Sequence, residues 1–149
     1  MTREVTPLPK APKPAVKPRK AVKKKRATTA AELKRAADKA WGTYIHQRDQ
    51  ACRICGKADG KLDAHHIMPR TFAATRADPT CGIIVCFRCH RYVCHGTDPF
   101  AAVLEYERIL GHDGYRALRE KAYSGVKANK DFWADRVLEL AALLKETDR

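Results

Sequence analysis

The sequence has no apolar stretch approaching the roughly 20 residues that a helix needs to cross a bilayer, and no apolar run near its start of the kind that forms a signal peptide. It is also poor in acidic residues, with 17 Asp and Glu against 30 Lys and Arg. The missing apolar segments predict a cytoplasmic protein that has no membrane partner. Because disulfides are disfavoured in that reducing compartment, the six cysteines require another explanation.

The positive charge is concentrated at the start of the chain, where residues 1–30 hold ten Lys and Arg against one acid, Glu4. Five of the eight prolines fall in residues 1–28, among Lys and Ala. This composition cannot bury enough apolar surface to offset its ordering entropy, so residues 1–28 are predicted to be a disordered tail. The expected partner of the tail is DNA, because phosphates attract clustered cations. Its densest candidate DNA contacts are Lys23, Lys24, Lys25 and Arg26.

Two alternatives for the tail remain open. It could serve as a solubilising segment or as a targeting signal. A membrane surface is less favoured, because no aromatic residue accompanies the charges to insert into lipid.

Residues 29–149 predict one small α+β domain, with a core of about residues 48–96 and a helical extension over 98–146. Thr29 and Glu32 form the pattern of a capping box before an apolar stripe of helical spacing, which predicts a helix over residues 30–48. Short strands are expected at residues 62–67 and 83–85, followed by a helix that starts within 87–93.

The last third of the chain is predicted to be helical scaffold without chemistry of its own. Asp98 as N-cap, Pro99 at the first position and Gly111 as a stop predict one helix. A short helix over about residues 115–123 follows, and a final helix starts at Asn129 or Asp131.

Four cysteines form two Cys-x-x-Cys pairs, Cys52 with Cys55 and Cys86 with Cys89. This local spacing is typical of a tetrahedral zinc site. Since four sulfurs leave no open position for water, the zinc would be structural. The alternative is a reactive dithiol or a set of buried cysteines. The two remaining cysteines are expected to be small buried side chains.

Four of the six histidines lie close to these pairs: His65, His66, His90 and His95. Adjacent residues of a strand point to opposite faces, so His65 and His66 are not expected to bind the same ion. One of them could bind a divalent metal while the other acts as a base. Phosphodiester hydrolysis needs these two parts, a base for the attacking water and a cation for the developing charge.

The run from Cys52-Arg-Ile-Cys55 through Ala64-His-His-Ile-Met-Pro-Arg70 to Ile83-Ile-Val-Cys-Phe-Arg-Cys-His90 resembles the zinc-knuckled HNH, or ββα-metal, endonucleases. The following aromatic segment, up to His95, is similar to phage HNH proteins, including NinG-type recombination nucleases. The resemblance covers about residues 48–125. It implies a ββα-metal core with zinc knuckles built from four cysteines, flanked by helices at both ends, in a phage-encoded or bacterial protein.

The resemblance also implies roles for individual residues. His66 would be the general base, and His65 and His90 would bind the catalytic ion, Mg²⁺ or another divalent cation. His95 would be a further ligand or a phosphate contact, and Asp63 a ligand or the partner of one. Candidate DNA contacts around the motif are Arg70, Arg76, Arg88 and Arg91.

One position departs from the family pattern. Where the family has an asparagine that ties the loop orienting the base, this chain has Cys81. A thiol replaces an amide poorly as donor and acceptor. Either Thr80 holds the loop instead, or activity is reduced.

The sequence therefore predicts a DNA endonuclease. The alternative is a zinc-stabilised DNA-binding module that does not cut and acts within a larger phage packaging or recombination complex.

Overall fold

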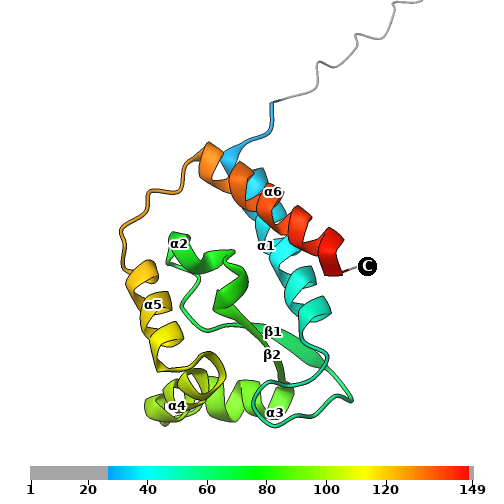
Figure 1. Ribbon diagram of the computed structural model, residues 1–149, viewed down its shortest axis with the longest axis vertical. Coiled ribbons are helices and arrows are strands. Elements are labelled where there is room, and N and C mark those ends of the chain that lie inside the picture. Colours follow the sequence, from blue (N-terminus) through cyan, green and yellow to red (C-terminus); the bar gives the residue numbers. More distant parts are fainter. Residues whose placement is uncertain (1–26, 148–149) are drawn as a thin grey trace, which may run out of the picture.

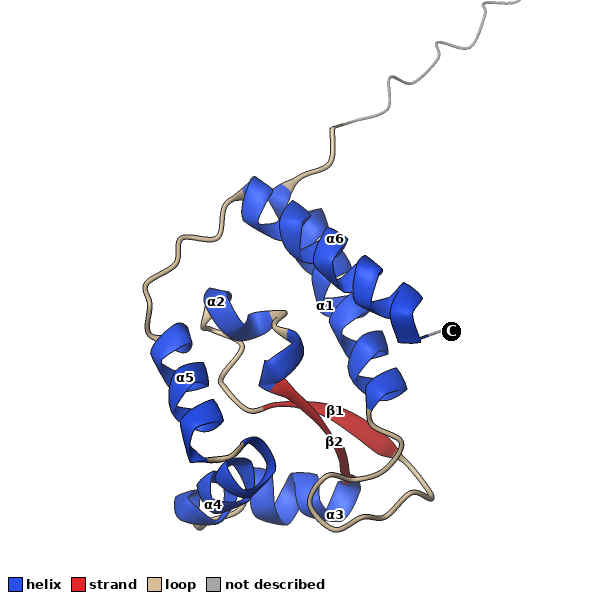
Figure 2. Ribbon diagram, viewed as in Figure 1, coloured by secondary structure: helices blue, strands red, loops and turns tan. Residues whose placement is uncertain are grey.

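The structure, a computed structural model, describes residues 27–147 and shows a small α+β fold with six helices and a two-stranded antiparallel sheet in that range. Figures 1 and 2 show the hairpin in the middle, with α1 and α6 on one side and α4 and α5 on the other. The elements are α1 (Ala30–Arg48), β1 (Leu62–His66), α2 (Ala73–Arg76), the 3-10 turn η1 (Pro79–Cys81), β2 (Gly82–Cys86), α3 (Phe87–Cys89), the π-helical turn η2 (His90–Cys94), α4 (Pro99–Leu110), α5 (His112–Ala122) and α6 (Lys130–Thr147). The predicted contacts Lys23, Lys24, Lys25 and Arg26 lie outside the described residues.

The helix ends confirm the capping patterns of the sequence. The Thr29 hydroxyl accepts a hydrogen bond from the Glu32 amide at 3.2 Å, and the Glu32 carboxylate accepts one from the Thr29 amide at 2.7 Å. Asp98 caps α4 by accepting from the Phe100 amide at 2.9 Å. The sequence left Asn129 or Asp131 as the start of the last helix. The Asn129 side chain accepts a hydrogen bond from the Phe132 amide and so caps α6, which begins at Lys130.

One predicted boundary is wrong. The helix expected to start at about Tyr115 begins at His112. Gly111, with φ of 74°, ends α4 and is also the N-cap of α5, so no linker separates the two helices. The Tyr115 amide donates to the Gly111 carbonyl, which closes the first turn of α5.

The hairpin register sends the two adjacent histidines to opposite faces. His65 pairs with Ile83, and His66 pairs with Gly82. Residues paired across an antiparallel sheet share a face. His65 therefore lies on the face covered by α4 and α5, and His66 on the face covered by α1.

Each face of the hairpin has its own apolar core. On one side, Trp41 and Ile45 of α1 pack with Ile84 and with Trp133 and Leu140 of α6. α6 belongs to the helical extension that the sequence predicted, and it packs against α1, the first helix of the fold. Gly82 permits this contact, because a Cβ there would lie 2.4 Å from the Trp41 ring.

The other core contains side chains of β2 together with α4 and α5. Its central residues are Ile83, Val85, Tyr106, Tyr115 and Leu118. The two cores hold the hairpin between them, and so fix the orientation of every side chain on it.

A buried carboxylate ties the end of α1 to β2. Asp49 is 5% exposed, and it accepts hydrogen bonds from the Ile84 amide at 3.1 Å and from Arg48 at 2.8 Å. Arg48 also donates to the Pro79 and Gly82 carbonyls at 2.7 and 2.6 Å. The start of β2 is therefore fixed against the first helix.

None of the helices within residues 27–147 has both the length and the apolar character that crossing a membrane requires.

Candidate metal centres

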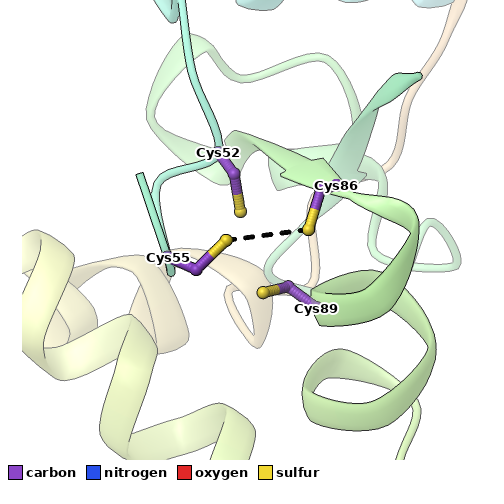
Figure 3. Close-up of side chains that lie close together, drawn as sticks. All are labelled: Cys52, Cys55, Cys86 and Cys89. Carbon is purple, nitrogen blue, oxygen red and sulfur yellow. Dashed lines mark hydrogen bonds between the residues drawn. The ribbon is translucent and has the colours of Figure 1, made fainter. Parts of the chain in front are cut away.

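The four cysteines of the two Cys-x-x-Cys pairs converge, with their sulfurs within 4.8 Å of one another (Figure 3). The Cys55 and Cys86 sulfurs are 3.7 Å apart. A tetrahedron of sulfurs about 2.3 Å from a zinc ion has edges of about 3.8 Å, whereas a disulfide needs about 2.05 Å. The cluster therefore has the dimensions of a metal site and not of a disulfide.

Local backbone geometry produces this convergence. Gly56, with φ of 76°, donates its amide to the Cys52 carbonyl and turns the chain back after the first pair. Cys86 ends β2, and Cys89 lies in α3 directly after it. Arg108 of α4 donates to the Arg53 carbonyl at 3.1 Å and so holds the first turn from outside.

The thiols of the cluster differ in proton affinity. Burial by itself would raise the pKa of Cys52, but hydrogen bonds from Cys55, Cys86 and Ile54 lower the pKa to about 7. Burial and the neighbouring sulfur groups raise the pKa of Cys89. A zinc ion bound here would have to displace the protons of all four thiols, because the thiolate is the form that binds a metal.

A second cluster consists of three imidazoles. His65, His90 and His95 each offer a nitrogen, and these atoms also lie within 4.8 Å of one another. The centroid of the His65 ring is 5.0 Å from that of His90 and 5.1 Å from that of His95. The three histidines named from the sequence as metal ligands or phosphate contact are thus brought together.

The π-helical turn η2 explains how two of these histidines meet. The His95 amide donates to the His90 carbonyl at 3.1 Å, an i to i+5 bond. In a regular α-helix, residues five apart point about 140° away from each other. The wider turn brings the two rings to one side, with centroids 5.0 Å apart. Such turns occur often at functional sites.

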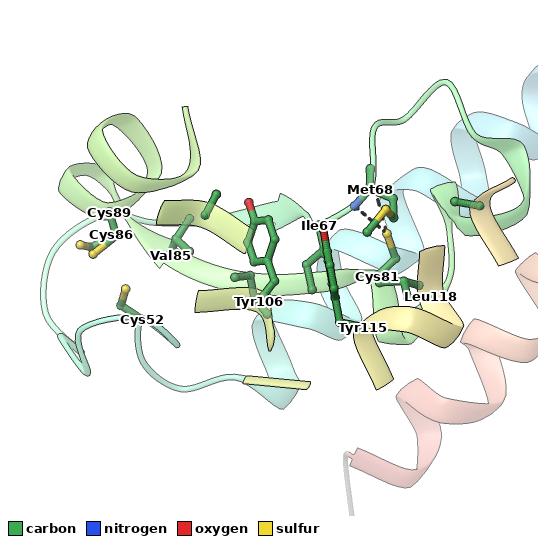
Figure 4. Close-up of a cluster of buried hydrophobic side chains, with 13 residues drawn as sticks. Cys52, Ile67, Met68, Cys81, Val85, Cys86, Cys89, Tyr106, Tyr115 and Leu118 are labelled. Carbon is green, nitrogen blue, oxygen red and sulfur yellow. Dashed lines mark hydrogen bonds between the residues drawn. The ribbon is translucent and has the colours of Figure 1, made fainter. Parts of the chain in front are cut away.

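Two further side chains lie beside the rings of the histidine cluster. The Tyr106 hydroxyl lies 2.7 Å from Nε2 of His65, which leaves Nδ1 of that ring for a metal (Figure 4 shows Tyr106 in the core beneath the hairpin). Asp63 Oδ2 lies 3.8 Å from Nδ1 of His90, which leaves Nε2 of that ring. Asp63 thus lies next to His90, at a distance longer than a hydrogen bond. Tyr106 belongs to α4, a helix that the sequence treated as scaffold, and its contact with His65 was not predicted.

Burial keeps the innermost histidine of this cluster neutral. His65 is 7% exposed, and burial together with the nearby His90 and His95 lowers its pKa from 6.5 to about 3. A neutral imidazole is the form that binds a metal ion.

His66 lies outside the cluster and has different neighbours. Its ring stacks on Trp41 with centroids 3.7 Å apart and an angle of 19° between the planes. Its Nε2 lies 2.7 Å from the Arg76 carbonyl oxygen, which can only accept, so Nε2 carries the proton. Burial lowers the pKa of His66, which keeps the ring neutral near neutral pH.

The loop between the strands is held mainly by a residue that the sequence did not single out, Asp78, which is 2% exposed. Its carboxylate accepts from the Thr80 amide and hydroxyl at 2.8 and 2.6 Å and pairs with Lys121 of α5. Burial by itself would raise the pKa of Asp78, but these donors lower it. Its carbonyl accepts from the Trp41 indole at 2.8 Å, which also fixes the ring stacked on His66.

Cys81, which the resemblance to HNH proteins singled out, is fully buried. Burial raises its pKa to about 11, so it remains a thiol. Its sulfur lies 3.3 Å from the Met68 amide, which donates to it (Figure 4). The thiol therefore contributes to packing within the loop, while the ring of His66 is oriented by a backbone carbonyl.

A groove of about 490 Å³ connects the two kinds of histidine. It is lined by both strand histidines, by His90 and His95, and by Asp38, Trp41 and Arg70 among others. Arg76, a candidate DNA contact from the sequence, forms a two-pronged ion pair with Asp38, with both nitrogen–oxygen distances 2.8 Å.

Comparisons with protein-family models, with curated proteins and with solved structures find no match for this chain.

Proposed function

We propose that this protein is a metal-dependent endonuclease of the HNH type that hydrolyses DNA phosphodiester bonds. One observation carries the proposal. His66 lines the same groove as the three converging imidazoles, but it is not part of their cluster. Within the hairpin, the side chain of His66 points to the face opposite that of His65. A free base beside a metal-type ligand set is the combination that hydrolysis requires.

The surroundings of His66 fit the role of general base. With the proton on Nε2 and donated to the Arg76 carbonyl, the lone pair of the neutral ring is on Nδ1. That nitrogen can accept the proton of a water molecule that attacks phosphorus. Trp41 limits rotation of the ring, and the lowered pKa keeps it unprotonated at neutral pH.

The histidine cluster fits a divalent ion with open coordination positions. Three protein ligands, with the remaining positions left for water and substrate, are typical of catalytic metal sites. Such an ion would stabilise negative charge on the phosphate and on the leaving oxygen. Imidazole suits Zn²⁺, Ni²⁺ and similar ions, whereas Mg²⁺ prefers oxygen ligands. Among the divalent cations that the sequence left open, the donor set of His65, His90 and His95 therefore favours a transition metal over Mg²⁺.

The remaining elements follow from this assignment. The hairpin and the segment α3–η2 would form the ββα-metal unit, with a structural zinc on the four cysteines at the junction of strand and helix. Arg70, exposed at the groove, would hold a phosphate beside the scissile bond. Arg76 would act as a positioning residue, since Asp38 holds its side chain while its carbonyl orients His66.

Plasmid nicking tests the proposal. The full chain is assayed with Mn²⁺, Ni²⁺, Zn²⁺ or Mg²⁺ and compared with His66→Ala. Loss of a general base is expected to reduce cleavage by about 10²- to 10⁴-fold. The matched control is His46→Ala, because His46 is an exposed histidine of α1 that does not line the groove.

Zinc content and circular dichroism must be unchanged in both variants, so that a loss of cleavage reports chemistry. If His66→Ala cut DNA as fast as the parent protein, the base assignment would be wrong. DNA binding without nicking in any divalent metal would favour the alternative, a binding module within a larger assembly.

A further inference from the structure

Two large aromatic side chains stand exposed immediately beside the histidine cluster. Phe87 is 63% exposed and Tyr92 is 67% exposed. Both line a hollow of about 590 Å³ whose wall also includes His90 and His95. A single exposed apolar side chain needs no explanation, but two aromatic rings grouped at one hollow beside a candidate site can mark a binding surface.

This hollow adjoins the groove that contains His66. The two depressions share His90 and His95, which are two of the three imidazoles in the cluster. A phosphate held at the cluster would thus lie near the base and Arg70, which line the groove, and near the two aromatic rings, which line the hollow. The nucleotide attached to that phosphate could then reach the rings.

Basic side chains line a further hollow next to the aromatic rings. Phe87 also lines a third hollow, which contains Lys57, Lys61 and Arg88. The only carboxylate among the described residues that line this third hollow is Asp59, which pairs with Lys57 at 3.6 Å. Arg91 lines the aromatic hollow itself, and no acidic side chain is among its described lining residues. The three neighbouring hollows, which share lining residues, therefore suit a polyanion that carries flat apolar groups.

The turn beneath Tyr92 is closely packed. A Cβ at Gly96 would lie 2.2 Å from the Tyr92 carbonyl oxygen, so only glycine allows the chain to pass there. Tyr92 itself lies in η2, between the two histidines that this turn brings together. The backbone that carries the ring is thereby set at a fixed place relative to the histidine cluster.

We infer that Tyr92 and Phe87 form a stacking surface for an unpaired base of the nucleotide next to the cleaved phosphate. A base inside a duplex is already stacked on both sides, whereas an unpaired base has a free face for an aromatic ring. The inference rests on the proposed nuclease site and names its substrate class, DNA with an unpaired or single-stranded nucleotide at the site of cleavage.

Binding measured without cleavage tests this inference separately from the chemistry. In a His66→Ala background, the full chain is titrated with a duplex that contains one unpaired 2-aminopurine and with the fully paired duplex. We expect tighter binding of the first duplex and quenching of its fluorescence. Tyr92→Ala should weaken that binding by about 5- to 100-fold and leave the paired duplex almost unaffected.

Two controls sharpen the test. Tyr92→Phe keeps the ring and should bind like the parent, and Phe100→Ala removes an aromatic side chain that is 73% exposed outside the hollow. Equal losses for both duplexes, or no loss in Tyr92→Ala, would overturn the inference. A preference for unpaired DNA that depends on Tyr92, in a protein that cuts nothing, would support the stacking surface while refuting the proposed chemistry.

Discussion

The two clusters lie next to the same hairpin, but they differ in chemistry and in their neighbours. The four cysteines supply only sulfur, the donor set of a complete tetrahedral zinc site, although the Cys55 side chain is exposed. The three histidines supply only nitrogen, and they open into a groove with a fourth histidine close by. Four sulfurs would leave no coordination position for water, whereas three nitrogens would leave at least one, so we expect a structural role for the first cluster and propose the second as the catalytic site.

The largest expected effect comes from breaking the cysteine cluster. Cys86→Ser removes one of its four sulfurs, and we expect loss of bound zinc and unfolding of the hairpin. Structural zinc contributes about 10–16 kcal/mol in small zinc-dependent domains, which is comparable to the whole stability of a domain, about 5–15 kcal/mol. Metal analysis and thermal unfolding measure the two effects. Cys94→Ser, outside the cluster, should keep its zinc, and a folded, zinc-free Cys86→Ser would refute the structural role.

A smaller effect is expected from the support of the histidine cluster. Tyr106→Phe removes the hydroxyl 2.7 Å from Nε2 of His65 but keeps the ring in the core. Losing such a partner of a metal ligand typically weakens metal binding by about 10- to 100-fold. Calorimetric titration with Ni²⁺ or Mn²⁺ measures the change, with the cysteine site already filled by zinc.

The matched control for that experiment is Tyr115→Phe, a buried tyrosine of α5 in the same core. Its metal affinity should equal that of the parent. Equal affinity in Tyr106→Phe would show that this hydroxyl has no part in orienting His65.

The smallest effect concerns pH. His66 must be neutral to accept a proton, so cleavage falls as pH drops through its pKa. Because burial lowers that pKa below 6.5, the acid limb of the rate profile should have its midpoint below pH 6.5, and the rate should be nearly flat above pH 7. Cleavage rates measured with saturating metal at each pH provide the test. A midpoint at or above pH 6.5 would contradict the burial of the base.

Much of the fold followed from local patterns in the sequence. The capping box at Thr29, the cap at Asp98 and the stop at Gly111 act within a few residues, so sequence reasoning placed α1 and α4 correctly. The cysteine pairs were recognised for the same reason, since each ligand lies three residues from its neighbour. The alternation of side chains along a strand also predicted that His65 and His66 point to opposite faces, and the strand register confirms this.

The rest depended on contacts between distant segments. Trp41 precedes His66 by 25 residues, and it looked like one more apolar residue of a helical stripe. Tyr106 lies 41 residues after His65 and carried no motif. Asp78 resembled an ordinary turn residue, although it is buried against Lys121 and ties the loop to Trp41. Only the packing of α1, α4 and α5 on the two faces of the hairpin gives these residues their roles.

The most direct test of the two-centre arrangement is a crystal structure of the zinc-loaded protein soaked in Mn²⁺ or Ni²⁺, with anomalous scattering recorded for each metal. We predict zinc on the four cysteines and the second metal among His65, His90 and His95, with the His66 ring free of metal and its Nε2 still on the Arg76 carbonyl. An absence of the second metal from the three imidazoles, or its ligation by His66, would contradict the separation of ligand and base on which the proposed function depends.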